Sequence, residues 1–241
     1  MTDVPRPLPW QLRFLDYDEP CTISHERNAV HAEQPGVVTM VTWCVVDAVP
    51  HGFFADLRQA ELQWLSRHGF DARRPLYRRE IRKRSPKLWM EYYERFIFGP
   101  ERLLDQCRGS CPLRDPKLAG IVAESLLYFD EQRYLVLDFV VMPNHVHVLF
   151  CMRGEGMVHQ VRRWKRYTAR AINQELGRSG AFWHRGFWDR MMRNRAHFLR
   201  CRRYVAENPY LAGLEPGSYI HYSRPLPRKI ETWPEQTPED P

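Results

Sequence analysis

Residues 134–151 read YLVLDFVVMPNHVHVLFC, and this stretch decides the fold of the chain. Two runs rich in β-branched and aromatic residues, 134–141 and 145–151, are typical of strands. Pro143-Asn144, a pair that favours turns, separates them. The stretch therefore predicts two strands joined as a hairpin.

The sequence around this hairpin predicts strands that alternate with helices. Residues 37–46 carry apolar side chains at both odd and even positions, which indicates a central strand, and a further strand is predicted at 187–193. Amphipathic patterns and start signals predict helices at 54–68, 85–97, 115–129, 157–176 and 196–208. The last helix is expected to stop before Pro209, because proline disfavours helix in the residue before it. We expect an α+β fold, an antiparallel sheet with packed helices.

Composition divides the 241 residues into three parts. Residues 1–36 are predicted to be an arm that is ordered only if it docks, 37–214 the main domain, and 215–241 a partly disordered extension. There is no apolar run long enough to cross a membrane and no secretory signal pattern, so we expect a cytoplasmic protein.

Charge is distributed unevenly along the chain. Residues 151–230 hold 17 Lys and Arg against 5 Asp and Glu, a net charge of +12, whereas the rest of the chain carries −5. One positive face suggests a polyanionic partner. An ordinary solvated basic surface is the alternative.

His145 and His147 stand two residues apart on a predicted strand. Because strand side chains alternate, both imidazoles project from one face, as two nitrogen ligands of a metal ion would. A further ligand would have to come from elsewhere in the chain. The alternative is a pair of ordinary strand histidines.

The last predicted helix carries Tyr204 and Asn208 one turn apart on one face. This pair could be a nucleophile beside a metal ligand, or a surface tyrosine and a helix-ending asparagine. Nearby arginines, or a metal ion, would favour the phenolate that attack requires. Tyr167 is the rival nucleophile, but Ala171 at the corresponding position one turn later offers no ligand.

Basic side chains crowd the helix predicted at 157–176 and the segments after it. We expect DNA phosphates to be bound by Arg162, Arg163, Lys165, Arg166, Arg170, Arg185, Arg193, Arg202 and Arg203. Trp164 is predicted to lie in the core.

Four stretches in order resemble the REP-associated tyrosine transposases, relatives of small insertion-sequence transposases. MPNHVH at 142–147 resembles their HUH signature, in which two histidines flank a hydrophobic residue. The other similar stretches are 164–173, 182–193 and 204–214, and Leu104-Asp105 and 111–116 match one subgroup. The segment after 214 departs from the family pattern.

The resemblance implies a fold, a reaction and partners. The fold would have an HUH endonuclease core, a ferredoxin-like antiparallel sheet. His145, His147 and Asn208 would hold Mg²⁺ or Mn²⁺, and Tyr204 would attack a phosphate of hairpin-containing single-stranded DNA through a 5′-phosphotyrosine intermediate. The protein would act as a transposase, a monomer or homodimer that does not bind membranes. The alternative is a domesticated protein that binds DNA hairpins without cleaving them.

Overall fold

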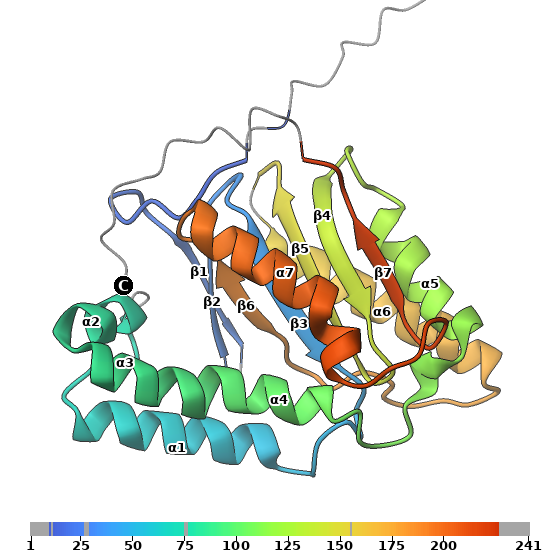
Figure 1. The fold of residues 1–241 in the computed structure, drawn as a ribbon, viewed down its shortest axis with the longest axis horizontal. Helices are drawn as coiled ribbons and strands as arrows, with labels where there is room; N and C mark the ends of the chain where they lie inside the picture. The colour runs from blue at the N-terminus through green and yellow to red at the C-terminus, as the bar shows by residue number, and fades with distance from the viewer. Residues whose placement is uncertain (1–9, 11, 27–28, 75–76, 155, 227–241) are drawn as a thin grey trace, which may run out of the picture.

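The computed structural model describes residues 10, 12–26, 29–74, 77–154 and 156–226, which build a five-stranded sheet with helices on both faces (Figure 1). The sheet has the order β6-β3-β5-β4-β7, and every neighbouring pair is antiparallel. The strands are β3 (Thr39–Cys44), β4 (Tyr134–Val141), β5 (His145–Met152), β6 (Trp188–Met191) and β7 (Ile220–Ser223). The predicted hairpin is confirmed as β4 and β5, and β3 lies inside the sheet as expected.

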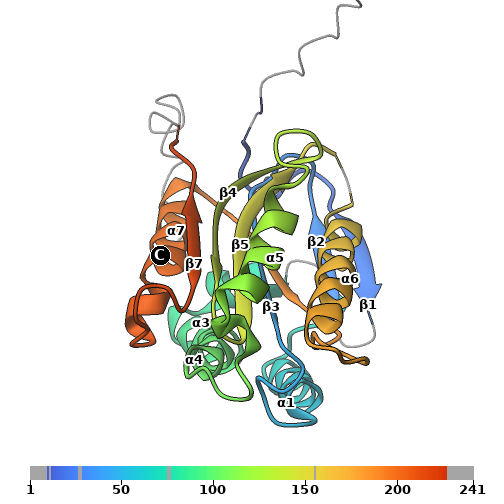
Figure 2. The same cartoon turned by 90° about the vertical axis from the view of Figure 1, so that its right-hand side faces the viewer.

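The core of the fold is ferredoxin-like. Without β7, the chain order is β3, α5 (Pro116–Leu127), β4, β5, α6 (Met157–Glu175), β6. The first and third of these strands lie side by side at the centre, which is the ferredoxin-like arrangement. Figure 2 shows α5 and α6 together on one face and α7 (Arg195–Leu211) on the other. The expected α+β class and ferredoxin-like core are confirmed.

Between β3 and α5 the chain inserts a group of helices with a core of its own. The helices are α1 (Phe53–Arg67), α2 (Tyr77–Arg84), α3 (Pro86–Tyr93), the π-helical turn η1 (Glu94–Phe98) and α4 (Gly99–Asp105), and a short 3₁₀ turn η2 (Pro112–Arg114) follows. Trp64, Tyr92 and Phe96 pack together inside it. Ser85 caps α3, as its position before Pro86 predicts, because its side chain accepts from the Leu88 N–H at 3.3 Å. The sequence analysis missed α2 and α4.

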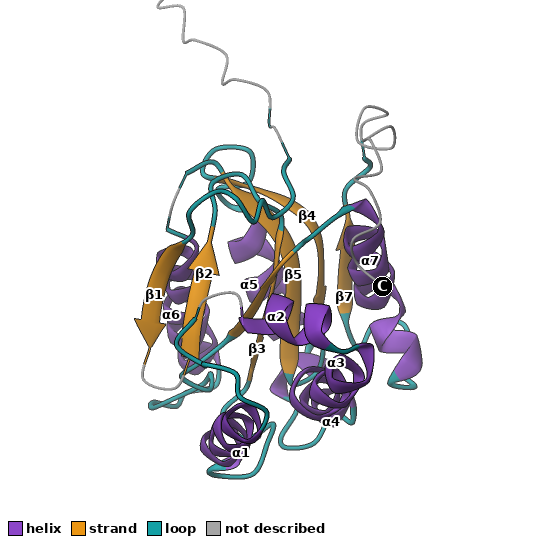
Figure 3. Ribbon diagram, turned by 90° about the vertical axis from the view of Figure 1, so that its left-hand side faces the viewer, coloured by secondary structure: helices purple, strands orange, loops and turns teal. Residues whose placement is uncertain are grey.

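A two-stranded N-terminal sheet, β1 (Thr22–Glu26) and β2 (Ala29–Glu33), docks beside the main sheet (Figure 3). His31 pairs with Asp189 of β6 and stacks on Phe187 with ring centroids 4.1 Å apart. The Glu33 carboxylate accepts from the N–H groups of Gly156 and Met157 and so caps α6. The described part of the predicted arm is therefore docked, whereas residues 1–9 and the predicted disorder of 227–241 lie outside the described residues.

The predicted end of the last helix is wrong, because α7 continues through Pro209 to Leu211. A proline in the last turn removes one backbone donor there. The end is still closed, since Ala212 N–H donates to the Asn208 carbonyl at 3.0 Å and Leu214 N–H to the Pro209 carbonyl at 2.9 Å. Among the described helices, none combines the length and apolar character that crossing a bilayer requires.

Candidate active site

The two histidines of β5 face α7. Val146, Val148 and Phe150 point into the core under α5 and α6, so the alternate positions turn His145 and His147 to the opposite face. Both imidazoles are fully buried, and their Nε2 atoms lie 3.0 Å apart. The prediction that they share one face is confirmed.

Hydrogen bonds at the Nδ1 atoms orient both rings. Asn144 Nδ2 donates to the Arg108 carbonyl at 3.0 Å, so its Oδ1 accepts from His145 Nδ1 at 2.7 Å. Thr42 on β3 is the register partner of His147, and its hydroxyl lies 2.7 Å from His147 Nδ1. Such contacts fix the tautomer and the ring orientation of metal-binding histidines. The contact at His145 Nδ1 leaves the Nε2 lone pair of that ring facing the space between the two imidazoles.

The inserted helices add a carboxylate to this space. Asp105 is the last residue of α4, and its Oδ1 lies 3.6 Å from His145 Nε2. One ligand atom from each of Asp105, His145 and His147 lies within 4.8 Å of the other two. Sequence reasoning did not assign Asp105 to the site. The one available signal was the resemblance of Leu104-Asp105 to a transposase subgroup.

Helix α7 brings Tyr204 and Asn208 to the same carboxylate. The Tyr204 hydroxyl lies 3.4 Å from Asp105 Oδ2, and its ring centroid lies 5.3 Å from that of His147. Asn208 Nδ2 donates to Asp105 Oδ1 at 3.0 Å. Asn208 Oδ1 is buried and has no hydrogen-bond partner in the described part of the chain. The structure thus joins the predicted tyrosine and asparagine to the histidines through Asp105.

Burial determines the protonation states in the site. Burial lowers the pKa of His145 to about 3 and that of His147 well below its usual value, so both imidazoles are neutral near pH 7. Burial also raises the pKa of Asp105 to about 6. The pKa of the Tyr204 phenol is raised by burial and then by the charges of Glu101 and Asp105, which outweigh Arg190. Arg190 thus favours the phenolate, as expected of a nearby arginine, but burial and the two carboxylates outweigh it.

The basic helix α6 lies on the sheet face opposite Tyr204. Its exposed Arg163, Arg166 and Arg170 therefore point away from the histidines. Trp164 is buried in the core, as predicted. Tyr167, the rival nucleophile, is 63% exposed on this far face, and the described structure gives it no contact with the histidine pair.

Two residues expected to bind phosphates are engaged in the fold. Lys165 is buried, and its ammonium donates to the carbonyls of His184, Arg185 and Gly186 at 2.6–2.9 Å. Arg202 pairs with the buried Asp138 at 2.8 Å and donates to the Arg224 carbonyl, which ties α7 to the segment after β7. The prediction that Lys165 and Arg202 bind phosphates is therefore corrected, because both stabilise the fold. The sequence shows that a residue is basic, but it does not show that acceptors within the fold already bind its side chain.

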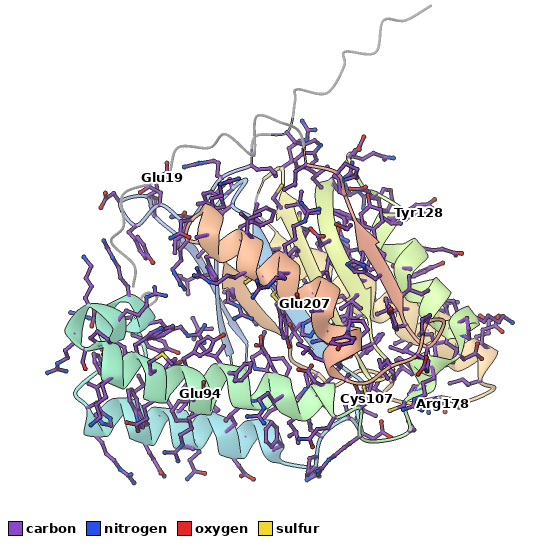
Figure 4. All side chains as sticks on the ribbon, in the orientation of Figure 1. Glu19, Glu94, Cys107, Tyr128, Arg178 and Glu207 are labelled. Carbon is purple, nitrogen blue, oxygen red and sulfur yellow. The ribbon has the colours of Figure 1, made fainter. Side chains whose placement is uncertain are left out.

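The other predicted phosphate-binding residues occupy two places. Arg162, Arg185 and Arg193 line a cavity that reaches Tyr204. Arg203 is exposed on the outer side of α7, 3.6 Å from Glu207, which Figure 4 labels.

A comparison with known families locates the similarity in the part of the chain that carries most of this site. Residues 123–208 match the family model for "Transposase IS200 like". The matched segment contains His145, His147, Tyr204 and Asn208, whereas Asp105 lies outside it. The match confirms the resemblance to insertion-sequence transposases.

Individual proteins were compared by sequence and by fold. No curated protein sequence matches the chain. The fold search finds a solved structure described as "Structure of the REP associates tyrosine transposase bound to a REP hairpin". The two chains are 13% identical with a TM-score of 0.41, and the match covers 88% of this chain and 81% of that chain.

Proposed function

We propose that this protein is a metal-dependent tyrosine transposase that cleaves and rejoins single-stranded, hairpin-containing DNA. The observation that carries the proposal is the convergence of His145, His147, Asp105 and Tyr204 from three separate parts of the fold. A protein that only binds DNA has no need of a half-buried tyrosine beside a set of candidate metal ligands.

The residues present fit a divalent cation. Neutral imidazole nitrogens and a carboxylate oxygen converge, and the buried Asn208 Oδ1 has no other described partner. His145, His147 and Asp105 would hold the ion, with Asn208 as a further candidate ligand. A set with two nitrogen donors suits Mn²⁺ better than Mg²⁺, which prefers oxygen ligands. The bound ion would supply Lewis acidity at the scissile phosphate and positive charge beside the phenol.

Tyr204 is the proposed nucleophile. Its phenolic oxygen would form a bond to phosphorus as the bond to the 3′ oxygen breaks, which leaves a 5′-phosphotyrosine and a free 3′-OH. Asp105 Oδ2, 3.4 Å from the hydroxyl, is the nearest described acceptor for the phenolic proton. Attack of another 3′-OH on the phosphotyrosine would reverse these bond changes and rejoin strands, so no ATP is required.

The DNA contacts are proposed in two groups. Arg162, Arg185 and Arg193 line the cavity at Tyr204 and would contact the strand to be cut. Arg163, Arg166 and Arg170 of α6, on the far face, would contact DNA outside the cleavage site. The oligomeric state, monomer or homodimer, and a location at the nucleoid remain parts of the proposal.

The test is cleavage of end-labelled hairpin DNA with unpaired flanks in the presence of Mn²⁺. On a denaturing gel we expect a shortened product and a covalent protein–DNA band, both absent for Tyr204→Phe. Tyr167→Phe is the matched control and should cleave normally. Cleavage that persists in Tyr204→Phe would refute the choice of nucleophile, whereas tight binding without cleavage by either protein would support the domesticated, non-catalytic alternative.

A further inference from the structure

A cavity of about 1060 Å³ opens between the inserted helices and α7, and it has no counterpart in the sequence analysis. Its base is formed by β2 and β6, one wall by α1–α3, and the other by the first turns of α7. In Figure 1 the inserted helices lie below β2 and β6, which belong to two neighbouring sheets. Tyr204 is part of the lining, so the cavity ends at the proposed nucleophile.

The cavity is strongly cationic. The arginines that line it are Arg58, Arg74, Arg78, Arg79, Arg82, Arg162, Arg185, Arg190, Arg193 and Arg200. Its three acidic residues are already partnered: Glu61 with Arg58, Glu101 with Arg190, and Asp189 with His31. Arg74 also has a partner, Glu80, outside the lining. Arg79, Arg185 and Arg200 form no ion pair with a carboxylate of the described residues, so their positive charge favours a polyanion.

Aromatic side chains lie among these arginines. Trp89 and Tyr93 of α3 and Trp188 of β6 are half-buried in the lining. A duplex hides the faces of its bases, so rings recessed between two walls can reach only bases that are unpaired. Positive grooves with interspersed aromatic rings are the way proteins bind single strands without strong sequence preference.

We propose that this cavity is the binding site for the unpaired strand that flanks the scissile phosphate, and that the helical insertion 53–105 exists to form its outer wall. The inference rests on the proposed function, which it deepens by separating the single-stranded subsite from Arg163, Arg166 and Arg170 of α6. Arg79 and Arg200 stand on opposite walls and would contact backbone phosphates on either side of the strand. Asp105, at the end of the same insertion, joins this wall to His145 and Tyr204.

The experiment measures equilibrium binding of fluorescein-labelled oligothymidylate by anisotropy, with every protein in a Tyr204→Phe background so that chemistry does not intervene. The test variant is Arg79→Gln with Arg200→Gln. The control is Arg95→Gln with Arg102→Gln, which removes the same charge from exposed positions on the insertion that do not line the cavity. Thermal melts establish that both double variants are folded.

We expect the test variant to bind oligothymidylate about tenfold more weakly and the control to bind like the parent. The salt slope of log Kd should fall by about 1.4 in the test variant alone, since each single-strand phosphate contact contributes about 0.7. Equal losses in both variants, or no loss in the test variant, would overturn the inference. Cleavage by the wild type is scored separately. If the wild type cleaves DNA but all variants bind oligothymidylate equally, only the cavity proposal is refuted. If the test variant loses binding as expected but the wild type never cleaves, only the transposase proposal is refuted.

Discussion

Acidification of the metal-free protein should destabilise it through its buried neutral histidines. His145 is fully buried, and His197 is 6% exposed in the first turn of α7. Burial lowers the pKa of His197 well below its usual value, and the positive charges of Arg193 and Arg190 lower it further. Because the folded pKa lies below that of the unfolded chain, the unfolded state takes up protons first. The stability is present above about pH 6.5 and is lost as the pH falls below it.

The size of the effect follows from the shifts. At pH 5.5 each histidine that stays neutral in the folded protein lowers the free energy of unfolding by about 1.4 kcal/mol. His145, His147 and His197 together therefore lower it by about 4 kcal/mol. Asp105 and Asp138 act in the opposite sense, because burial raises each pKa to about 6 and the folded protein binds their protons first. They offset about 0.8 kcal/mol each at this pH. The net loss, about 2–3 kcal/mol, is a large share of a typical domain stability of about 5–15 kcal/mol.

Urea unfolding followed by tryptophan fluorescence, in EDTA at pH 7.5 and 5.5, measures this loss. His197→Asn is the matched variant. In the wild type the Arg193 N–H donates to His197 Nδ1 at 3.2 Å. The Asn side chain offers an acceptor in its place but does not titrate. The variant should lose about 1.4 kcal/mol less than the wild type over the same pH interval. Equal losses in the two proteins would refute the reasoning that His197 is neutral when folded.

Three further substitutions test the site and its support. Asp105→Asn should weaken Mn²⁺ binding by at least about tenfold in calorimetry, and unchanged affinity would exclude Asp105 as a ligand. Asn144→Ala should weaken it by about 10–100-fold, because His145 loses the bond that orients its ring; an effect limited to stability would contradict that role. Glu101→Gln should lower the free energy of unfolding by about 1.5–3 kcal/mol, because it leaves the half-buried Arg190 without its carboxylate, and an unfolding midpoint like that of the wild type would argue against this ion pair.

Local pattern in the sequence determined the centre of the fold. Two runs of β-branched and aromatic residues around Pro143-Asn144 predicted the hairpin. His145 and His147 were placed on one face because strand side chains alternate whatever surrounds them. Helical spacing likewise placed Tyr204 and Asn208 on one side of α7. These features depend on neighbours in the chain, so sequence alone could predict them.

Tertiary structure decided which of these faces meet. Periodicity shows which side of a helix is apolar, but not which face of the sheet that side covers, and α6 proved to lie opposite Tyr204. Asp105 joins the histidines from 40 residues upstream only because the insertion folds back against α7. The cavity that the same insertion encloses, and the burial that keeps the site histidines neutral, likewise arise from packing between distant segments, which no local pattern records.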